Sequence, residues 1–330
     1  MATPSSVWPG NKPMDKTSAL AEAGGKTQAV QSCRTLRIIE TAGFPDYALV
    51  DSGAGRKLER FGSILVERPE PQALWQPKLV QGAWLEANAV FSGDDEGEKG
   101  KWRIERPVPA SWPVRIKNVT VLCKLSGFRH LGLFPEQLPH WDWMLDGLRR
   151  IEGERPRVLN LFAYTGAASL LAAAVGAEVT HVDASKKAIS WAKENQAVSR
   201  LADAPLRWIL DDARKFVARD VRRGRTYHVI LVDPPKFGRG PDNKVWDLFT
   251  HLPELLRNCV LLLDRSTARL CLTVYAIRAS ALAIDGLARE VLNDRGGLFE
   301  SGELAIVEQS GARAIGTSLF SRWRSDDLAR

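Results

Sequence analysis

The stretch RVLNLFAYTGAASLLAAAVGAEVTHVD, residues 157–183, decides the fold. It opens with an apolar run typical of a buried strand and turns at Gly166. An alanine- and leucine-rich run from Ala167 predicts a helix, and Glu178 to Asp183 predicts a second strand. A strand, a crossover helix and a second strand form a βαβ unit, whose two strands are parallel.

The same alternation continues along the chain. Further strands are predicted at 206–210, 227–233 and 269–275, and helices from Ser185, from about Asp212 and near 247–264. Such alternation is typical of a parallel sheet with helices on both faces. Two final β runs, 303–308 and 312–320, flank Gly311 and predict an antiparallel hairpin. We therefore expect an α/β fold with a doubly wound, mostly parallel sheet.

The chain before this sheet has a different texture. Residues 1–34 show no sustained period and are rich in small and polar residues, so we expect a poorly ordered arm. Residues 35–125 contain short β-like runs broken by turn residues, which predicts a small, mostly β domain suited to substrate recognition. Its expected strands lie at 47–50, 62–66, 79–85, 101–104 and 114–125, with a hairpin tip at 92–100. Residues 126–330 then form the sheet domain.

Composition excludes several classes of protein. Of the 330 residues, 45% are hydrophobic and 26% charged, which is typical of a globular protein. No apolar run approaches the roughly 20 residues of a membrane helix, and no secretory signal is recognisable, so we expect a soluble, cytoplasmic protein. The four cysteines, Cys33, Cys123, Cys259 and Cys271, form no CxxC motif and are not grouped with the five histidines. We expect reduced thiols and no metal site.

The charge is uneven along the chain. The net charge is +7, and residues 101–157 carry eleven basic and six acidic side chains, a local excess of +5. A basic region favours a polyanionic partner such as a nucleic acid. An ordinary solvated surface explains the same excess equally well.

The loops after the first two strands indicate the kind of cofactor, because open parallel sheets bind ligands beyond the carboxyl ends of their strands. The first loop, Asn160–Gly166, has one glycine where a dinucleotide site needs GxGxxG to approach a pyrophosphate. The second strand ends at Asp183, followed by Ala184, and an acidic side chain there binds both hydroxyls of a ribose. Capping the next helix is the alternative role of Asp183, which Ser185 can also fill. The pattern predicts a cofactor with a ribose and no nicotinamide or flavin dinucleotide.

The loops after the third and fourth strands are also acidic. Asp211 and Asp212 precede Ala213; one carboxylate is suited to accept from an exocyclic amine such as that of adenine and the other to cap the next helix. Spacing does not separate these two roles. The fourth strand is followed by Asp233-Pro234-Pro235-Lys236-Phe237, whose prolines make the backbone rigid and leave the first carbonyls free to face a cleft. A rigid row of acceptors suits catalysis by positioning.

Together these motifs resemble class I S-adenosylmethionine-dependent methyltransferases. The order and spacing are most similar to bacterial large-subunit ribosomal RNA methyltransferases with FxYTG and DPPKF signatures, over roughly 125–280. The resemblance implies a Rossmann-like methyltransferase sheet, S-adenosyl-L-methionine as cofactor and RNA as substrate. It places Asn160, Phe162, Ala163, Thr165 and Gly166 around the methionine end, Asp183 and Ala184 at the ribose, Asp211, Asp212 and Ala213 at the adenine, and Asp233–Phe237 where donor and acceptor meet.

Upstream, residues 127–137 resemble the family segment that folds over the cofactor, which makes Phe134 and Gln137 candidate contacts. His140, Trp141 and Trp143 follow at helical spacing and are either core residues or a platform for unpaired bases. Seven of the eleven tryptophans precede residue 150, so the β domain either grips RNA or uses them to fill its core.

The chain departs from relatives that methylate a pyrimidine carbon. Those relatives carry a cysteine nucleophile late in the fifth strand, where this chain has Ala276. Cys271 lies earlier in that strand and is expected to be buried. We therefore expect a methyltransferase without a cysteine nucleophile at this position, with the acceptor atom left open. The alternatives are a small-molecule or protein methyltransferase, or a catalytically silent nucleic-acid-binding protein of the same fold.

Overall fold

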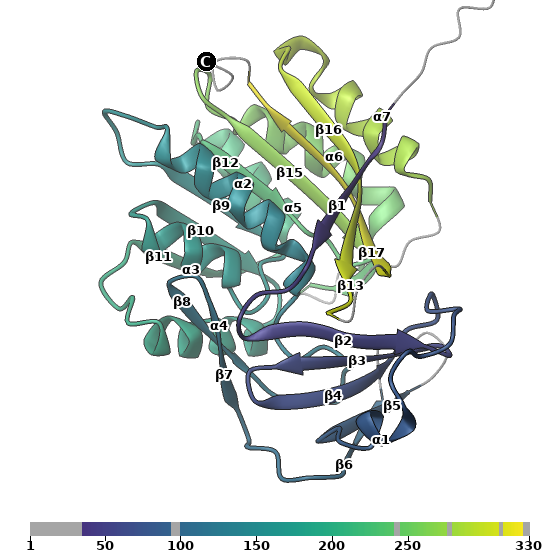
Figure 1. Ribbon diagram of the computed structural model, residues 1–330. Helices are drawn as coiled ribbons and strands as arrows, with labels where there is room; N and C mark the ends of the chain where they lie inside the picture. Colours follow the sequence, from purple (N-terminus) through teal and green to yellow (C-terminus); the bar gives the residue numbers. More distant parts are fainter. Residues whose placement is uncertain (1–34, 94–99, 241–244, 276–278, 310–312, 326–330) are drawn as a thin grey trace, which may run out of the picture. The chain divides into compact units, whose positions relative to one another are not determined.

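The computed structural model describes residues 35–93, 100–240, 245–275, 279–309 and 313–325 (Figure 1). Residues Leu36–Arg330 form one compact unit. The hairpin-tip residues 94–99, Ala276 and Gly311 lie outside the described residues, as do the arm 1–34 and Cys33 within it. No described helix combines the length and the apolar run that a membrane span requires.

The large sheet has eight strands in the order β1-β16-β17-β15-β12-β9-β10-β11. The five strands at its centre and far edge run parallel, as the alternation predicts: β9 (Arg157–Leu161), β10 (Glu178–Asp183), β11 (Leu206–Leu210), β12 (Val229–Val232) and β15 (Arg269–Tyr275). The expected antiparallel hairpin is β16 (Leu298–Val307) with β17 (Ala314–Arg324), and β17 also pairs antiparallel with β15. The predicted doubly wound, mostly parallel sheet is confirmed.

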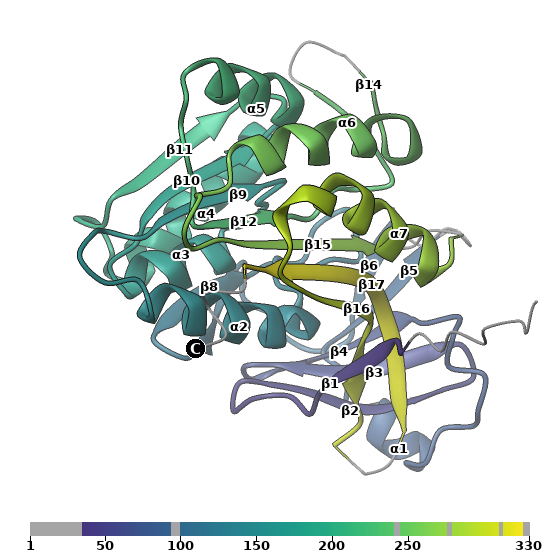
Figure 2. The same cartoon turned by 90° about the horizontal axis from the view of Figure 1, so that it is seen from above.

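Helices cover both faces of this sheet (Figure 2). One layer holds α2 (Leu138–Arg149), α3 (Ala167–Ala174) and α4 (Lys186–Val198), and the other holds α5 (Ala213–Arg222), α6 (Leu248–Leu261) and α7 (Ala281–Val291). Two separate apolar clusters follow from these layers. One joins α2 and α3 to the sheet and to the small β sheet, and the other lies under α5, α6 and α7.

The small sheet has five strands in the order β2-β3-β4-β5-β6, and a separate two-stranded hairpin joins β7 to β8. The strands are β2 (Tyr47–Gly53), β3 (Arg56–Phe61), β4 (Ile64–Pro69), β5 (Ala89–Gly93), β6 (Gly100–Ile104), β7 (Trp112–Ile116) and β8 (Val119–Cys123). The single run expected at 114–125 is therefore a hairpin, in which Lys117 takes a left-handed conformation with φ 53°. The run at 79–85 is not a strand, because it holds the short helix α1 (Gln81–Trp84) instead.

The first strand does not belong to the small sheet. β1 (Arg37–Thr41) pairs in parallel with β16 at the edge of the large sheet, with Arg37 opposite Gly302. The chain then enters β2, and the main-chain bonds between Leu49 and Glu308–Gln309 join β2 to the end of β16. The residues expected to form one small domain thus contribute to both sheets.

Candidate cofactor and active site

Three of the sequence-predicted loops follow the neighbouring parallel strands β12, β9 and β10, and the fourth follows β11 at the edge. Strands β10 and β12 flank β9 on opposite sides, so the strand order reverses at β9. Ligands bind beyond the carboxyl ends of strands at such a reversal. The structure therefore brings the loops at Asn160–Gly166, Asp183, Asp211–Asp212 and Asp233–Lys236 to one edge of one sheet.

The loop after β9 has an unusual backbone. Phe162 (φ 56°), Tyr164 (φ 52°) and Gly166 (φ 87°) all adopt positive φ angles, which are uncommon outside glycine. The loop is held in this shape by bonds from the Ala163 amide to the Val182 carbonyl (3.1 Å) and from the Tyr164 amide to a carboxylate oxygen of Asp183 (2.8 Å). Strained residues of this kind concentrate at ligand sites.

Two of the predicted contacts in this loop turn their side chains into the fold. The Asn160 side chain is buried and donates to the Ser169 hydroxyl (2.9 Å), which contacts His181 Nδ1 (3.0 Å). The Thr165 hydroxyl donates to the Gly132 carbonyl, which ties the loop to the segment before Phe134. These residues can reach a ligand through their backbone only. Burial lowers the pKa of His181 to about 3, so this imidazole is neutral.

Asp183 connects the loops after β9 and β10. Its two carboxylate oxygens accept from the backbone amides of Tyr164 and Ser185, each at 2.8 Å. Burial raises the pKa of Asp183, and these two amides oppose that shift. Ser185, whose hydroxyl accepts from the Ala188 amide, is the N-cap of α4. The capping alternative for Asp183 therefore falls to Ser185, and the ribose role stays a prediction.

The structure separates the two aspartates that follow β11. Asp212 is the N-cap of α5, and its Oδ1 accepts from the Arg214 and Lys215 amides at 2.8 and 3.2 Å. Asp211 is less buried and accepts from the Asp212 amide (2.8 Å) and from Arg219 (2.9 Å). Asp212 thus performs the capping role, and an adenine contact from this loop stays a prediction.

The acid-proline-proline segment after β12 is anchored at its far end. The Trp246 indole donates to the Pro235 carbonyl (2.6 Å), and the Leu248 amide donates to the Lys236 carbonyl (3.0 Å). Within the described residues, the carbonyls of Asp233 and Pro234 receive no such bond. The next residues form a two-stranded ribbon, β13 (Phe237–Arg239) with β14 (Val245–Asp247). The first two carbonyls of the segment are therefore the ones without a hydrogen bond among the described residues.

Asp233 has one paired and one unpaired oxygen. Oδ2 accepts from Gln137 Nε2 at 3.0 Å, whereas Oδ1 is buried and has no hydrogen-bond partner. Burial raises the pKa of Asp233 well above its usual value, Glu136 raises it further, and the bond from Gln137 opposes the shift. A carboxylate with a raised pKa is a better proton acceptor near neutral pH.

The segment before α2 reaches this site as the sequence predicts. Phe134 packs against Tyr275 and Tyr164, with ring centroids 5.3 and 5.7 Å apart, and Gln137 bonds both Asp233 and the Tyr275 hydroxyl. Tyr275 was not among the residues predicted from the sequence. Its signal was its position as the last residue of a parallel strand, the same rule that selected Asp183.

The tryptophans of the small β region and the aromatic residues of α2 mostly pack within the protein. Each indole nitrogen of the four tryptophans in the small β region donates to a group of the protein, namely Trp75 to Ser52, Trp84 to Asp51, Trp102 to Phe128 and Trp112 to Phe61. His140 and Trp141 are buried, and the Trp143 ring lies under the guanidinium groups of Arg269 and Arg322. The core interpretation of these aromatics is therefore favoured over a platform for bases.

The described cysteines lie in the core. Cys123, Cys259 and Cys271 are buried, and burial raises the pKa of the Cys271 thiol to about 12. A thiol with a raised pKa is a poor nucleophile, because the thiolate is the reactive form.

One group of side chains with metal-ligating atoms, Glu154, His228 and Asp264, lies at the opposite end of the sheet. His228 Nδ1 accepts from the Arg157 amide (3.0 Å), so Nε2 carries the hydrogen and donates to Glu154 (3.2 Å). The Arg157 side chain pairs with both carboxylates. The group is therefore an ion-pair cluster in which the Arg157 guanidinium is the cation.

Cavities of about 350 and 600 Å³ also lie away from the strand tips, the first between β1 and α2 and the second at the ends of α5, α6 and α7.

The chain is similar in sequence and structure to known methyltransferases. The family model described as Conserved hypothetical protein 95 matches residues 144–275. The crystal structure of the S-adenosylmethionine-dependent methyltransferase from Agrobacterium tumefaciens is 49% identical, with a TM-score of 0.85, and the match covers 88% of this chain and 94% of that one. A Streptococcus mutans protein proposed to be such a methyltransferase is 14% identical over 84% of this chain and 75% of that one, with a TM-score of 0.65, and shows the fold alone.

Curated relatives match the part of the chain that holds the strand tips. Ribosomal RNA large subunit methyltransferase I of Citrobacter koseri is 29% identical over 213 residues, covering 59% of this chain and 52% of that protein. The K/L methyltransferase of Shewanella frigidimarina is 35% identical over 145 residues, covering 42% of this chain and 19% of that protein. The chain thus spans about half, or less, of these relatives. The near full-length match to the Agrobacterium enzyme shows the family, so this chain belongs to the S-adenosylmethionine-dependent methyltransferases and uses S-adenosylmethionine as its cofactor.

Proposed function

We propose that this methyltransferase acts on RNA, with ribosomal RNA as the preferred substrate. The observation that carries the proposal is the match of the strand-tip region to two kinds of ribosomal RNA large subunit methyltransferase, I and K/L. The proposal also places the enzyme in the cytoplasm, where ribosomes are made.

The surface beside Asp233 suits a nucleotide. Phe237 is 59% exposed, and the Lys236 ammonium lies 5.3 Å from the centre of its ring. Val245 on the same ribbon and Phe249 at the start of α6 are also exposed. An exposed aromatic ring stacks on an unpaired base, and an adjacent lysine pairs with a phosphate. In this proposal Phe237 receives the target base and Lys236 binds phosphate or the base edge.

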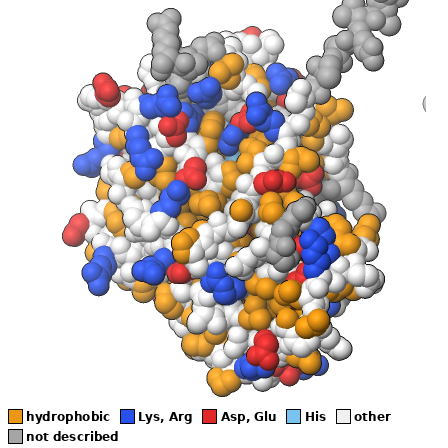
Figure 3. Space-filling view, viewed as in Figure 1, with side chains coloured by type: hydrophobic (Ala, Val, Ile, Leu, Met, Phe, Trp, Pro, Cys, Tyr) orange, Lys and Arg blue, Asp and Glu red, His pale blue; other side chains and the backbone are white. Residues whose placement is uncertain are grey.

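The basic residues give weaker support than their number suggests. In the stretch 101–157, Arg103, Arg106, Lys117, Lys124 and Arg150 all pair with acidic side chains. Lysine and arginine are interspersed with acidic side chains on the face in Figure 3. Exposed pairs of this kind contribute little to stability and can be exchanged for phosphate contacts. Charge on the small β sheet therefore permits RNA recognition without establishing it.

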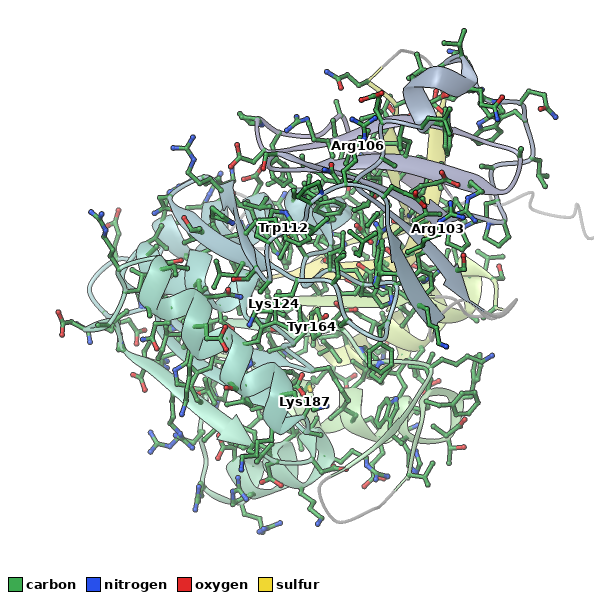
Figure 4. The ribbon with its side chains drawn as sticks, turned by 90° about the horizontal axis from the view of Figure 1, so that it is seen from below. Arg103, Arg106, Trp112, Lys124, Tyr164 and Lys187 are labelled. Carbon is green, nitrogen blue, oxygen red and sulfur yellow. The ribbon has the colours of Figure 1, made fainter. Side chains whose placement is uncertain are left out.

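Lys124 and Lys187 lie near Tyr164 of the cofactor loop in Figure 4, whereas Arg103 and Arg106 lie farther away, in the small β region. Lys124, after β8, lies 5.1 Å from the Trp191 ring, which packs at 5.9 Å from Tyr164 of the loop. Lys187 on α4 is exposed, and Arg103 and Arg106 come from β6 and the residues after it. These side chains are the ones that we propose to guide RNA toward the strand tips.

The residues of this chain fit the cofactor that the family requires. S-adenosylmethionine, when bound, supplies a methyl group on a sulfonium whose positive charge is lost as the methyl leaves. Asp183 would bind the ribose hydroxyls, and the left-handed loop Phe162–Gly166 would present its backbone to the methionine end. Asp211 and the amide of Ala213 would meet the adenine. Asp233 would orient the nucleophile and accept its proton. Alignment and exclusion of water then supply most of the acceleration.

The test is methyl transfer from labelled S-adenosylmethionine to total RNA, followed by nucleoside analysis. We expect label in one methylated nucleoside, with ribosomal RNA as the main carrier. Label in protein or in small molecules alone would favour the other acceptor classes. Filter binding of RNA across a salt series supplies a second readout, because phosphate contacts give a steep salt dependence that a small-substrate enzyme lacks.

A further inference from the structure

One glutamine amide joins three separate elements at the active site. Gln137 Nε2 lies 3.0 Å from Asp233 Oδ2 and 3.0 Å from the Tyr275 hydroxyl. An amide nitrogen carries two hydrogens, so both are committed, one to each partner. The Tyr275 hydroxyl oxygen therefore accepts, and its position determines where the second hydrogen of Gln137 points.

Each member of this trio has little freedom. Gln137 is buried at the end of the short helix η1 (Pro135–Gln137), and its backbone amide donates to the Phe134 carbonyl. Tyr275 ends β15, lies opposite Ser318 of β17 and packs its ring against Phe134. Asp233 directly follows β12. The carboxylate of Asp233 is therefore held in one orientation by groups that do not themselves react.

The free oxygen of Asp233 indicates what this orientation serves. Oδ1 is buried and has no partner, although buried acceptors are nearly always satisfied. Burying an acceptor without a donor is unfavourable. A fold that fixes the carboxylate and leaves this oxygen unpaired keeps it available for a donor from outside the protein.

We propose that Tyr275 is a positioning residue for methyl transfer: it accepts one amide hydrogen of Gln137, which turns the other to Asp233 Oδ2 and leaves Oδ1 facing the acceptor group. Tyr275 acts through Gln137 and does not touch the reacting atoms. The inference uses the proposed RNA substrate for its kinetic test only.

Besides burial, two groups of η1 shift the pKa of Asp233, the Glu136 carboxyl and the Gln137 side-chain amide. Tyr275 and Cys271 of β15 are the other titratable groups near Asp233, and burial and the charge of Asp233 raise the pKa of both. Burial and the neighbouring carboxyl of Glu136 raise the pKa of Asp233, and the bond from Gln137 lowers it. Weakening that bond therefore raises the pKa of Asp233, and the acid limb of the rate profile moves to higher pH.

The experiment compares Tyr275→Phe, Gln137→Met and the double variant. Tyr227→Phe is the matched control, because the Tyr227 hydroxyl also bonds a carboxylate, Asp220, at 2.7 Å but lies at the other end of β12. We measure S-adenosylmethionine affinity by calorimetry, kcat on total RNA as a function of pH, and the titration of Asp233 in the free enzyme. The titration uses ¹³C-carboxyl-labelled aspartate, with the resonance assigned by Asp233→Asn.

We expect Tyr275→Phe to lower kcat about tenfold, with cofactor affinity and RNA KM within about twofold of wild type. The Asp233 titration should move to higher pH, further in Gln137→Met than in Tyr275→Phe. The double variant should match Gln137→Met, and Tyr227→Phe should change neither kcat nor the titration.

Two results would overturn the inference. One is a Tyr275→Phe enzyme with wild-type kcat and Asp233 titration. The other is a Tyr275→Phe effect that persists at full size in the Gln137→Met background, which would show that Tyr275 acts by another route. If the wild type methylates no RNA, the proposed substrate fails, and the Asp233 titration still decides the role of Tyr275.

Discussion

The two ends of the large parallel sheet carry similar carboxyl groups in different states. At the amino ends of the strands, Glu154 and Asp264 pair with Arg157 and bond or approach His228. At the carboxyl ends, Asp183 accepts only from backbone amides, and Asp233 accepts from the neutral Gln137 and keeps one oxygen unpaired. In the first arrangement the carboxylates pair with a cation of the protein, whereas in the second one oxygen of Asp233 has no partner among the described residues.

The backbone differs in the same way. The carboxyl-end loop contains Phe162 and Tyr164 at positive φ, whereas Glu154, Arg157, His228 and Asp264 all have ordinary φ angles. Carboxylates and a histidine at one place therefore do not identify a site by themselves. An unpaired buried oxygen is not enough either, since Asp220 Oδ1 near the amino ends also has no hydrogen-bond partner. The better sign is an unpaired buried atom beside strained residues held by several bonds, since both features cost stability.

The largest expected effect is on the chemical step. Asp233→Asn removes the proton acceptor but keeps an oxygen for Gln137, so we expect kcat to fall by about a hundredfold or more. Cofactor affinity should stay near that of wild type. The matched change at the amino end, Asp264→Asn, should leave kcat unchanged. Steady-state methylation of total RNA checks both, and equal losses in the two variants would contradict the distinction between the ends.

Cofactor binding should depend on Asp183 almost as strongly. Asp183→Ala removes the proposed ribose ligand and an anchor of the loop, so we expect calorimetry to show at least about a hundredfold weaker S-adenosylmethionine binding, roughly 2.7 kcal/mol. Asp183→Asn keeps one oxygen for the Tyr164 amide and should weaken binding less. Ser185→Ala, which removes only the helix cap, is the control and should bind normally. Unchanged affinity in Asp183→Ala would exclude the ribose role.

A glycine pair isolates the close packing of the cofactor loop. Gly166 (φ 87°) and Gly176 (φ 91°) have similar backbones, but an added Cβ would lie 3.2 Å from the Ala192 side chain at Gly166 and meet nothing within 4 Å at Gly176. Alanine at either position costs about 1–2 kcal/mol for the left-handed conformation. We expect Gly166→Ala to be the less stable in chemical denaturation and to bind cofactor more weakly. Equal behaviour of the two variants would show that the loop tolerates the extra atom.

The smallest effect is a difference in the pH dependence of stability. Because the pKa of Asp233 is raised in the fold, its contribution to stability is present below about pH 4 and is lost as the pH rises through the raised pKa. Asp233→Asn should therefore raise the melting temperature at neutral pH and not at pH values near 3 to 4, by thermal unfolding.

Asp264 should behave in the opposite way. Burial opposes ionisation of Asp264, but bonds from Ser266 and Thr267 and the nearby His228 outweigh it and lower its pKa. Its stabilising contribution is present above the usual carboxyl pKa and is lost as the pH falls through the lowered one. Asp264→Asn should lower the melting temperature at neutral pH only slightly, because solvent screens this partly exposed group. A loss that persists in acid would show that ionisation of Asp264 is not its cause.

The sequence predicted the parts of the fold that local pattern controls. Strand–helix alternation after residue 156, the terminal hairpin and the helix starts near Ser185 and Asp212 are all confirmed. It failed where distant contacts decide. Residues 79–85 form no strand because the buried Asp51 carboxylate accepts from the Lys78 and Leu79 amides and from the Trp84 indole, which bends the segment around it.

The position of the candidate site could be predicted from where residues lie along the chain. The hydrogen-bond partners of its side chains could not. The rule that ligands meet strand tips selected Asp183 and Asp233, and the resemblance added Gln137. Spacing left open which of Asp211 and Asp212 caps the helix, and no local signal could show that Asn160 turns inward or that Tyr275 bonds Gln137. Each of these depends on contacts between residues distant in the sequence or on the direction in which a side chain points.

A crystal structure of the protein with S-adenosylhomocysteine, the product of methyl transfer, tests the proposed cofactor site most directly. We expect the ribose hydroxyls on Asp183, the adenine beside Asp211 and Ala213, and the sulfur directed toward Asp233. A nucleoside bound elsewhere, for example in the cavity at the ends of α5, α6 and α7, with the strand-tip edge left empty, would contradict it.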